Sequence, residues 1–242
     1  MSHPRFFAPS ASAPGDLVTL PDDEAEHLTR VLRLAPGDRV RVFDGRGAEF
    51  ASVVEAADKS GVRVRIGAPI ASAPEARVAV TLAQAVLKGD KMDAVVRDAV
   101  MIGVAEIQPI VSARTESSTA ALERGRRRER WERIAVSSAK QCGRAVVPPI
   151  LEPKRLEDVA LPSPVFVLVE PGAVSGLSLG ESEMPAAGRA SVLIGPEGGW
   201  TSEELEHAAT IGRLLTLGGR TLRADAMALV ALAALFARWR EY

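Results

Sequence analysis

The chain has 242 residues, of which 47% are hydrophobic and 25% are charged, and its formal net charge is -1. Such a composition is typical of a globular protein with one large or two small domains. No apolar run approaches the length of a membrane span, and the N-terminal residues lack a signal-peptide core, so we expect a cytoplasmic protein with no membrane partner. The single cysteine, Cys142, excludes an internal disulfide, and the scattered His3, His27 and His207 lack the spacing of metal ligands, so no metal is expected.

The N-terminal region has the pattern of a small β-rich domain. Residues 22–34, DDEAEHLTRVLRL, predict a short helix with an acidic first turn and with Arg30 and Arg33 near its end. Residues 39–66 then alternate between apolar and polar positions around turns at 44–47 and 59–61, which predicts antiparallel strands. Their arginines face away from the valines, and form either a solvated surface or an RNA-binding one. These arginines are Arg39, Arg41, Arg63 and Arg65.

The Pro- and Ala-rich segment ASAPEA, residues 71–76, predicts a domain boundary, with domains at 1–72 and 73–242. Beyond it, apolar strand-like runs alternate with helical patterns, which predicts an α/β domain with a parallel sheet covered on both faces. Ligands of such sheets bind beyond the carboxyl ends of the strands. The strand-like runs are VAVTLAQAV, VAEIQPIV, VFVLVE, SVLIG and LLTLG, and the helical ones are KMDAVVRDAVMIG, LERGRRRERWERIAVSSAKQ, TSEELEHAATIG and ADAMALVALAALFARW.

One helical segment is strongly basic although the whole chain is nearly neutral. Residues 122–133, LERGRRRERWER, hold six arginines against three glutamates. The pattern fits a solvated helix face with ion pairs four residues apart, and it fits an RNA-facing patch equally well.

The stretch LIGPEGGWTSEELE, residues 193–206, joins a strand to a helix. Thr201 and Glu204 predict a capping box, and Trp200 and Leu205 a hydrophobic staple, so the start of the helix is occupied by its own side chains. Neither GxxxxGK(S/T) nor GxGxxG, the two glycine-rich motifs that bind phosphate groups, is present. Their absence argues against a nucleoside triphosphate or dinucleotide site and against a dinucleotide-dependent oxidoreductase. The glycines serve either positive φ angles and close packing, or the approach of the backbone to a ligand that carries no phosphate.

A second stretch, LLTLGGRTLRADAM at residues 214–227, repeats the order of strand, glycine pair and helix and adds Arg220 and Arg223. Two such loops at one sheet edge can hold an adenosine-like ligand through backbone groups, which leaves the arginines for an anionic partner.

These motifs together resemble a known family. GPEGG before a capped helix, followed by LGGRTLRADAMA and a final apolar helix, resembles the SPOUT class of S-adenosylmethionine-dependent RNA methyltransferases. More narrowly, the chain resembles the RsmE family, which methylates N3 of a uridine in the 16S ribosomal RNA of the small subunit. The resemblance also includes RFF, HLTRVLRL, KGDKMDAVVRDAVMIGVAEIQPIVSART, RWERIAVSSAKQCGRAVVPPI and LVEP. The chain departs from the family at residues 224–227, where Ala-Asp-Ala-Met replaces the more usual Thr-Glu-Thr-Ala, and at 98–103, which lacks the usual Glu-Leu pair.

The resemblance implies an N-terminal PUA-like β-barrel that binds RNA, a C-terminal trefoil knot and a homodimer. It implies that two sets of residues surround S-adenosylmethionine: Leu193, Gly195, Glu197 and Gly198 from the first loop, and Leu217, Gly218, Arg220 and Leu222 from the second. The expected partner is 16S ribosomal RNA or the small subunit, and the expected RNA-binding residues are Arg5, Arg30, Arg33, Arg126 and Arg127.

Methylation of uridine N3 requires loss of its proton. We expect Arg223 to stabilise the negative charge that develops, and Glu197 either to act as base or only to order the turn. We expect Arg220 to contact either the methyl donor or an RNA phosphate. Cys142 lies far from both loops in the sequence and is not expected to be a nucleophile.

Two other functions compete with this hypothesis. A non-catalytic RNA-binding protein would explain the basic clusters but would leave the glycine loops without a purpose. A SPOUT methyltransferase could also act on another RNA position.

The final helix suggests self-association. Residues 226–237, AMALVALAALFA, carry no charge, so the helix is apolar on every side. It is either the interface of a homodimer or a fully internal helix.

Overall fold

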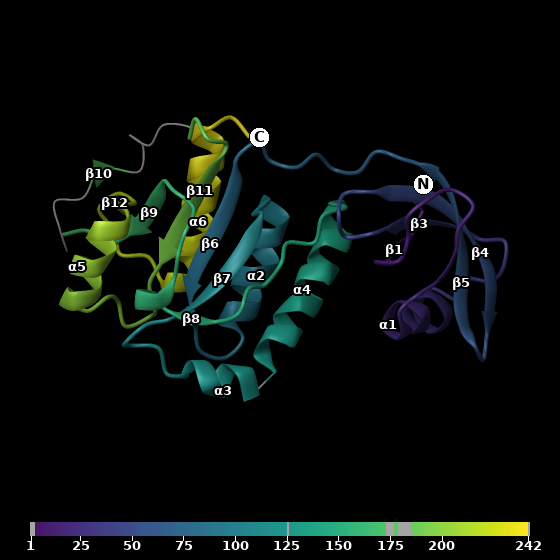
Figure 1. Ribbon diagram of the computed structural model, residues 1–242, viewed down its shortest axis with the longest axis horizontal. Coiled ribbons are helices and arrows are strands. Elements are labelled where there is room, and N and C mark those ends of the chain that lie inside the picture. The colour runs from purple at the N-terminus through teal and green to yellow at the C-terminus, as the bar shows by residue number, and fades with distance from the viewer. Residues whose placement is uncertain (1–2, 125, 173–176, 179–184, 242) are drawn as a thin grey trace. The chain divides into compact units, whose positions relative to one another are not determined.

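The structure, a computed structural model, describes residues 3–124, 126–172, 177–178 and 185–241 (Figure 1). The chain forms two compact units. The first contains residues up to Glu75 together with Val136–Val147, and the second contains Ala76–Ala135 and Pro148 onward. Helix α4 (Arg127–Cys142) is therefore divided between the units, which the single boundary expected near residue 72 did not foresee.

The first unit contains a five-stranded sheet in the order β1-β3-β4-β5-β2. The strands are β1 (Arg5–Phe7), β2 (Leu17–Thr19), β3 (Arg39–Phe43), β4 (Glu49–Asp58) and β5 (Gly61–Pro69). β3, β4 and β5 pair antiparallel in succession, as the alternating pattern predicts, while β1 pairs parallel with β3. Asp44 orders the first turn because its Oδ1 accepts hydrogen bonds from the amides of Arg46 and Ala48.

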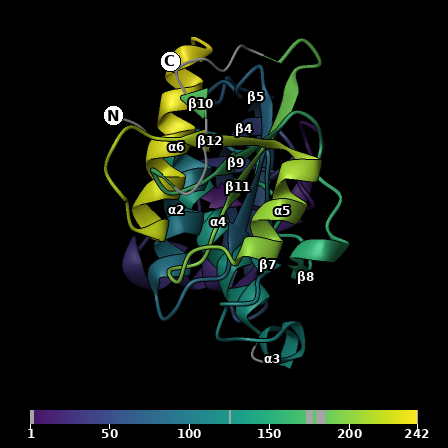
Figure 2. The ribbon, with the colours of Figure 1, turned by 90° about the vertical axis from the view of Figure 1, so that its left-hand side faces the viewer.

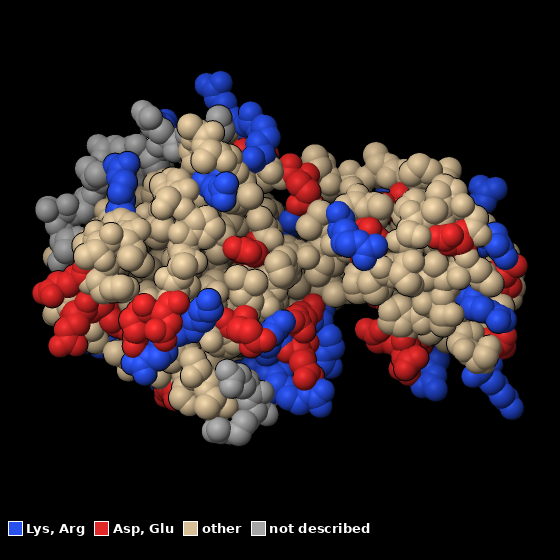
Figure 3. All heavy atoms as spheres, viewed as in Figure 1, with Lys and Arg blue, Asp and Glu red and all other residues tan. Residues whose placement is uncertain are grey.

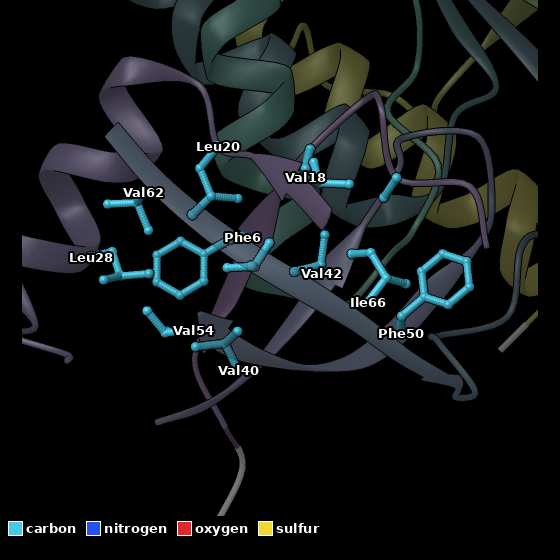
Figure 4. Close-up of a cluster of buried hydrophobic side chains, with 13 residues drawn as sticks. Phe6, Val18, Leu20, Leu28, Val40, Val42, Phe50, Val54, Val62 and Ile66 are labelled. Atoms are coloured by element: carbon cyan, nitrogen blue, oxygen red, sulfur yellow. The ribbon is translucent and has the colours of Figure 1, made fainter. Parts of the chain in front are cut away.

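One apolar cluster forms the core of this unit (Figure 4). Phe6 and Leu28 meet there, together with the inward valines of β3, β4 and β5, and the aromatic ring and the leucine side chain are completely buried. Alternate residues of the strands point to this core, as the sequence period requires. Two of the four outward arginines are paired on the surface, Arg63 with Asp58 and Arg65 with Glu55, while Arg41 pairs with the buried Glu49. The two surface pairs fit the solvated-surface interpretation.

The predicted helix over 22–34 is shorter and changes its winding. Helix α1 (Asp22–Glu26) passes into a π-helix, η1 (His27–Val31), which the Leu32 amide closes by donating to the His27 carbonyl. Arg33 then has a φ of 55°, a left-handed conformation that ends the helix before residue 34.

The second unit contains a seven-stranded parallel sheet in the order β10-β12-β9-β11-β6-β7-β8. The strands are β6 (Ala79–Ala85), β7 (Glu106–Val111), β8 (Lys154–Arg155), β9 (Val165–Leu168), β10 (Leu177–Ser178), β11 (Arg189–Ile194) and β12 (Arg213–Thr216). The helices are α2 (Lys91–Ile102), α3 (Thr119–Arg124), α4, a 3₁₀ turn η2 (Leu156–Asp158), α5 (Ser202–Ile211) and α6 (Ala224–Arg238). The predicted α/β class with a parallel sheet is confirmed.

Helices cover both faces of this sheet, as Figure 2 shows. α2 and α6 pack together on one face, with α6 against β11, and α5 lies on the other face over β9 and β12. The continuous helix predicted over residues 122–141 is interrupted instead: α3 ends at Arg124 and α4 begins at Arg127. Arg126 has a φ of 51°, and Gly125 lies outside the described residues. Among the described helices, none is both long and apolar enough to cross a membrane.

Candidate functional site

The site is built on the loop at residues 195–199, which follows β11 and leads into α5. We call it the first glycine loop. The capping box forms as predicted: the Glu204 amide donates to Thr201 Oγ1 at 3.2 Å, and the Thr201 amide donates to Glu204 Oε2 at 2.9 Å. The other carboxylate oxygen of Glu204 accepts from the Ala113 amide at 2.7 Å, so the same side chain ties the loop after β7 to the start of α5.

Close packing explains the glycines of the first glycine loop. A Cβ on Gly195 would lie 2.9 Å from the Trp200 ring, whose Nε1 donates to the Leu168 carbonyl. A Cβ on Gly198 would lie 3.2 and 3.3 Å from the side-chain carbons of Arg114. Gly199 has a φ of 69°, which favours glycine on backbone grounds as well. The loop is thus shaped by an indole ring and an arginine that come from other positions in the unit.

Two cations hold the same loop from other elements. Lys91, the first residue of α2, places Nζ 2.9 Å from Glu197 Oε1, and the Lys88 amide donates to the same oxygen at 3.3 Å. Arg114, three residues after β7, donates from Nη1 to the Gly198 carbonyl at 2.5 Å.

These contacts determine the charge state of Glu197. Burial, the largest single cause, raises the pKa of its carboxyl, but the hydrogen bonds from Lys91, from the Lys88 amide and from its own backbone, with the charge of Lys91, together lower the pKa from the ordinary 4.5. Glu197 is therefore an ionised, engaged carboxylate at neutral pH, which makes it a weak proton acceptor.

A cavity of about 450 Å³ opens beyond the carboxyl ends of β9 and β11. Its wall is apolar where Leu168, Val169, Ile194, Leu222 and Met227 line it. The charged lining residues are the cations Lys91, Arg114 and Arg223 and the carboxylates Glu170 and Glu197. Concave sites for small molecules commonly combine an apolar wall with a few charged groups in this way.

The second glycine loop, residues 217–223, joins β12 to α6 and forms another side of the cavity. Arg223 is the N-cap residue of α6; its side chain is 74% exposed, and its Nε lies 3.7 Å from Asp225 Oδ1. Gly218 and Gly219 have no heavy atom within 4 Å of the position of a Cβ. In contrast to the first glycine loop, this loop is open.

The cavity brings together five of the predicted site residues: Gly195, Glu197, Gly198, Leu222 and Arg223. The others do not line it. The Leu193 side chain is completely buried in the apolar cluster beneath α5, and Leu217, Gly218 and Arg220 lie in the second glycine loop outside the lining.

Sequence reasoning missed Lys91, Arg114 and Glu170 among the residues that line the cavity. Arg114 follows β7 and Glu170 follows β9, while Lys91 opens the helix after β6. The rule that ligands bind beyond the carboxyl ends of parallel strands was the signal that could have found all three.

Arg5, which the resemblance predicts to bind RNA, makes its contacts inside the first unit. Its guanidinium pairs with the buried carboxylate of Glu49 at 2.9 Å, and it donates to the carbonyls of Ala139, Lys140 and Arg144. The side chain is 9% exposed. It thus satisfies carbonyls at the C-terminal end of α4, and its donors are already occupied.

The basic segment at residues 126–133, which includes the start of α4, is largely paired with acidic residues. Arg126 pairs with Glu129, Arg128 with Glu132 and Glu152, and Arg130 with Asp93. Figure 3 shows the result on one face, where blue and red side chains interleave near α3 and α4, while red side chains gather over α5. Arg30 likewise pairs with Glu26, whereas no ion-pair partner of the half-buried Arg127 or the exposed Arg33 occurs among the described residues.

Neither a metal site nor a reactive thiol accompanies the cavity in the described part of the chain. Within residues 3–124, 126–172, 177–178 and 185–241, no group of three or more His, Cys, Asp or Glu side chains is placed to hold a metal ion. Cys142 is a half-buried free thiol at the end of α4, and it is not among the described residues that line the cavity.

Comparison with known families gives two matches that cover different parts of the chain. Residues 74–236 match a family described as "RNA methyltransferase domain", and residues 20–67 match one described as "RNA methyltransferase PUA domain". The second match agrees with the predicted PUA-like region at the N-terminus.

Individual relatives cover most of the chain. "Ribosomal RNA small subunit methyltransferase E" of Synechocystis sp. is 32% identical over 89% of this chain and 71% of its own length, and that of Mycobacterium tuberculosis is 29% identical over 97% and 92%. The crystal structure of the Neisseria gonorrhoeae protein of the same name, bound to S-adenosyl methionine, is 32% identical with a TM-score of 0.86, covering 98% of both chains. A Legionella pneumophila protein in complex with SAM is 27% identical with a TM-score of 0.88 over 98% of both chains.

Proposed function

The chain belongs to the ribosomal RNA small subunit methyltransferase E family, and from that premise we propose that it transfers a methyl group from S-adenosylmethionine to N3 of a uridine in 16S ribosomal RNA. The observation that carries the proposal is the cavity between the two glycine loops at the carboxyl edge of the parallel sheet. Non-catalytic RNA binding would leave this cavity unexplained.

The residues of the cavity fit S-adenosylmethionine. The apolar wall suits the adenine ring and the carbons next to the sulfonium sulfur, and the carbonyl and amide groups of the loops suit the ring nitrogens. Carboxylates at the rim suit a ligand that carries a sulfonium and an ammonium charge. Gly195, Glu197, Gly198 and Leu222 would line the bound molecule, and we propose that Leu193, Leu217, Gly218 and Arg220 support the two loops from behind or at the rim. When bound, S-adenosylmethionine supplies a methyl group on a positively charged sulfur.

Arg223 is our candidate for the catalytic residue. It lines the cavity, and its guanidinium is largely exposed, so donors remain to be offered to an RNA base at the cavity mouth. As the N3 proton leaves, negative charge spreads over the uracil ring and its oxygens. A fixed guanidinium stabilises that charge most in the transition state.

We assign Glu197 to positioning rather than to proton transfer. Its ion pair with Lys91 and its lowered pKa keep the carboxylate engaged with the loop. The alternative from the sequence, that Glu197 only orders the turn, is the one these contacts support.

We propose that RNA contacts Arg30, Arg33, Arg126 and Arg127, all with exposed or half-exposed side chains. Phosphate contacts of this kind position the RNA without reading its sequence. We assign Arg5 to the support of the N-terminal unit because its donors are occupied. Because ribosomal RNA or the small subunit is the proposed substrate, we propose that the protein acts in the cytoplasm without a membrane partner.

We further propose a homodimer that uses α6. One face of this helix is buried against α2 and β11, while Leu229 and Val230 remain 39% and 42% exposed on the other, and Met101 of α2 is 38% exposed. A fully internal helix would not expose them.

The same C-terminal region carries our proposal of a trefoil knot: the chain passes from β11 to β12 on the far side of β9, and then returns in α6 to β11.

The test is methyl transfer by the purified protein. Small-subunit RNA that lacks the modification is incubated with labelled S-adenosylmethionine, digested to nucleosides and separated by chromatography. We expect the label in N3-methyluridine. Label in a different nucleoside would support a SPOUT methyltransferase of another position, and binding of RNA with no label transferred would support a non-catalytic protein.

A further inference from the structure

The cavity contains a cation and a carboxylate that no described residue neutralises. We propose that Arg114 and Glu170 together bind the amino-acid end of S-adenosylmethionine, Arg114 holding its carboxylate and Glu170 its ammonium group. This inference deepens the proposed function and rests on it, because it assigns residues to one part of the same ligand.

Both residues stand at the same edge of the sheet and flank one glycine. Arg114 follows β7 and Glu170 follows β9, and both line the cavity. A Cβ on Gly199 would lie 3.4 Å from Glu170 Oε1 and 3.9 Å from Arg114 Nη1. The absence of a side chain at this position keeps the space between the two charges open.

Arg114 is fixed in place but retains most of its hydrogen-bonding capacity. Its Nη1 donates to the Gly198 carbonyl, its side-chain carbons pack where a Gly198 Cβ would be, and Glu204 holds the preceding amide of Ala113. A guanidinium has five N–H donors, and no carboxylate among the described residues pairs with this one. A pre-positioned guanidinium with free donors binds a carboxylate strongly and in a defined orientation.

Glu170 differs from the other carboxylate of the cavity. Glu197 forms an ion pair with Lys91. The exposed cation Arg223 lies near a different carboxylate, that of Asp225. For Glu170 no ion pair with any described cation occurs, and the residue is exposed to the cavity. With Arg223 assigned to the RNA base, the cavity charges that remain for the methyl donor are thus one of each sign.

This pair of opposite charges favours a zwitterion over a simple ion. An RNA phosphate placed on Arg114 would lie close to the Glu170 carboxylate, and a simple cation placed on Glu170 would lie close to the guanidinium. An α-amino acid group satisfies both because it carries an ammonium and a carboxylate on one carbon. S-adenosylmethionine has such a group at the end opposite its adenine.

Calorimetry with three ligands tests the assignment on the full-length protein. The ligands are S-adenosylmethionine, its decarboxylated analogue, which lacks the carboxylate, and 5′-methylthioadenosine, which lacks the whole amino-acid group. We expect Arg114→Ala to lower the affinity for S-adenosylmethionine roughly 10- to 100-fold. The affinity for the decarboxylated analogue should stay within about threefold of the wild-type value. Glu170→Gln should lower the affinity for S-adenosylmethionine roughly 5- to 30-fold and leave the affinity for 5′-methylthioadenosine unchanged.

Two further variants separate the charge contact from general damage. Gly198→Ala keeps the guanidinium but places a methyl group against the Arg114 side chain, so it should show the ligand pattern of Arg114→Ala more weakly. Arg189→Ala removes an exposed arginine from the opposite, amino end of β11 and should bind all three ligands as the wild type does. Melting curves accompany every variant.

The results distinguish this inference from the proposed function. Equal losses for all three ligands in Arg114→Ala would overturn the carboxylate contact, as would an unchanged affinity for S-adenosylmethionine combined with weaker RNA binding. A wild-type protein that binds no S-adenosylmethionine would overturn the proposed function, and this inference with it. Ligand-selective losses in both variants support the pair.

Discussion

The two glycine loops have the same sequence order but opposite surroundings. In the first, the missing side chains of Gly195 and Gly198 are replaced by the Trp200 ring and by Arg114. In the second, no heavy atom lies within 4 Å of a Cβ built on Gly218 or Gly219. The first loop is therefore held by other side chains of the protein, whereas the two glycines of the second loop have no packing neighbour. Glycines in the same sequence order are thus required by close packing in the first loop and have free space around them in the second.

The largest expected effect concerns the open loop. Under the proposed role of Arg223, Arg223→Ala removes a charge that acts mainly in the transition state, so single-turnover methylation at saturating RNA should fall roughly 30- to 1000-fold, or about 2 to 4 kcal/mol. The affinity for S-adenosylmethionine and the melting temperature should stay near those of the wild type. A rate within about threefold of the wild type would end the catalytic assignment, and a loss confined to RNA affinity, with a shallower salt dependence, would make Arg223 a phosphate contact.

The next effect tests whether a second copy covers the helix that follows the open loop. Val230→Asp places a carboxylate on the exposed apolar face of α6. The dimer should therefore dissociate at a roughly 100-fold higher protein concentration, which corresponds to about 3 kcal/mol. Light scattering over a concentration series measures it. Val53→Asp is the matched control, since Val53 is 40% exposed on β4 of the first unit. A wild-type protein that is monomeric at micromolar concentration would contradict the dimer.

The contrast between the loops predicts unequal tolerance of a methyl group. Gly195→Ala forces a Cβ against the Trp200 ring and should lower the free energy of unfolding by about 1 to 3 kcal/mol. Gly219→Ala meets no neighbour and needs no positive φ, so it should change that free energy by less than about 1 kcal/mol. Denaturant unfolding compares the two variants. Equal losses would remove the distinction between a packed and an open loop.

The smallest effect concerns the ion pair that anchors the first loop. Because the pKa of Glu197 is lowered, its contribution is present above the ordinary pKa of 4.5 and is lost as the pH falls through the folded-state value. Glu197→Gln should cost about 0.5 to 1 kcal/mol of unfolding free energy at pH 7, and the difference from the wild type should vanish in acid. Glu203→Gln, an exposed neighbour, is the control. A difference that persists below pH 3 would contradict an ionic origin.

The sequence was most informative where local chemistry decides the structure. The capping box of Thr201 and Glu204 and the hairpin strands around Asp44 follow from residue types a few positions apart. The break between α3 and α4 was missed because one glycine in a helical pattern is a weak signal.

Contacts between distant residues could not be predicted in the same way. Lys91 pairs with Glu197 across 106 positions, and Arg114 reaches Gly198 across 84. The sequence shows that Arg5 is charged, which suggested a contact with RNA. It does not show that Glu49 is buried or that the two side chains form an ion pair. Burial and pairing depend on the fold, and they decide which charges remain available to a ligand.

The most direct measurement is the mass of the 16S ribosomal RNA fragments from cells that lack this protein. The account predicts that one uridine loses a methyl group, that the wild-type protein restores it, and that Arg223→Ala at the same cellular level restores little of it. A methylation pattern identical with and without the protein would contradict the account.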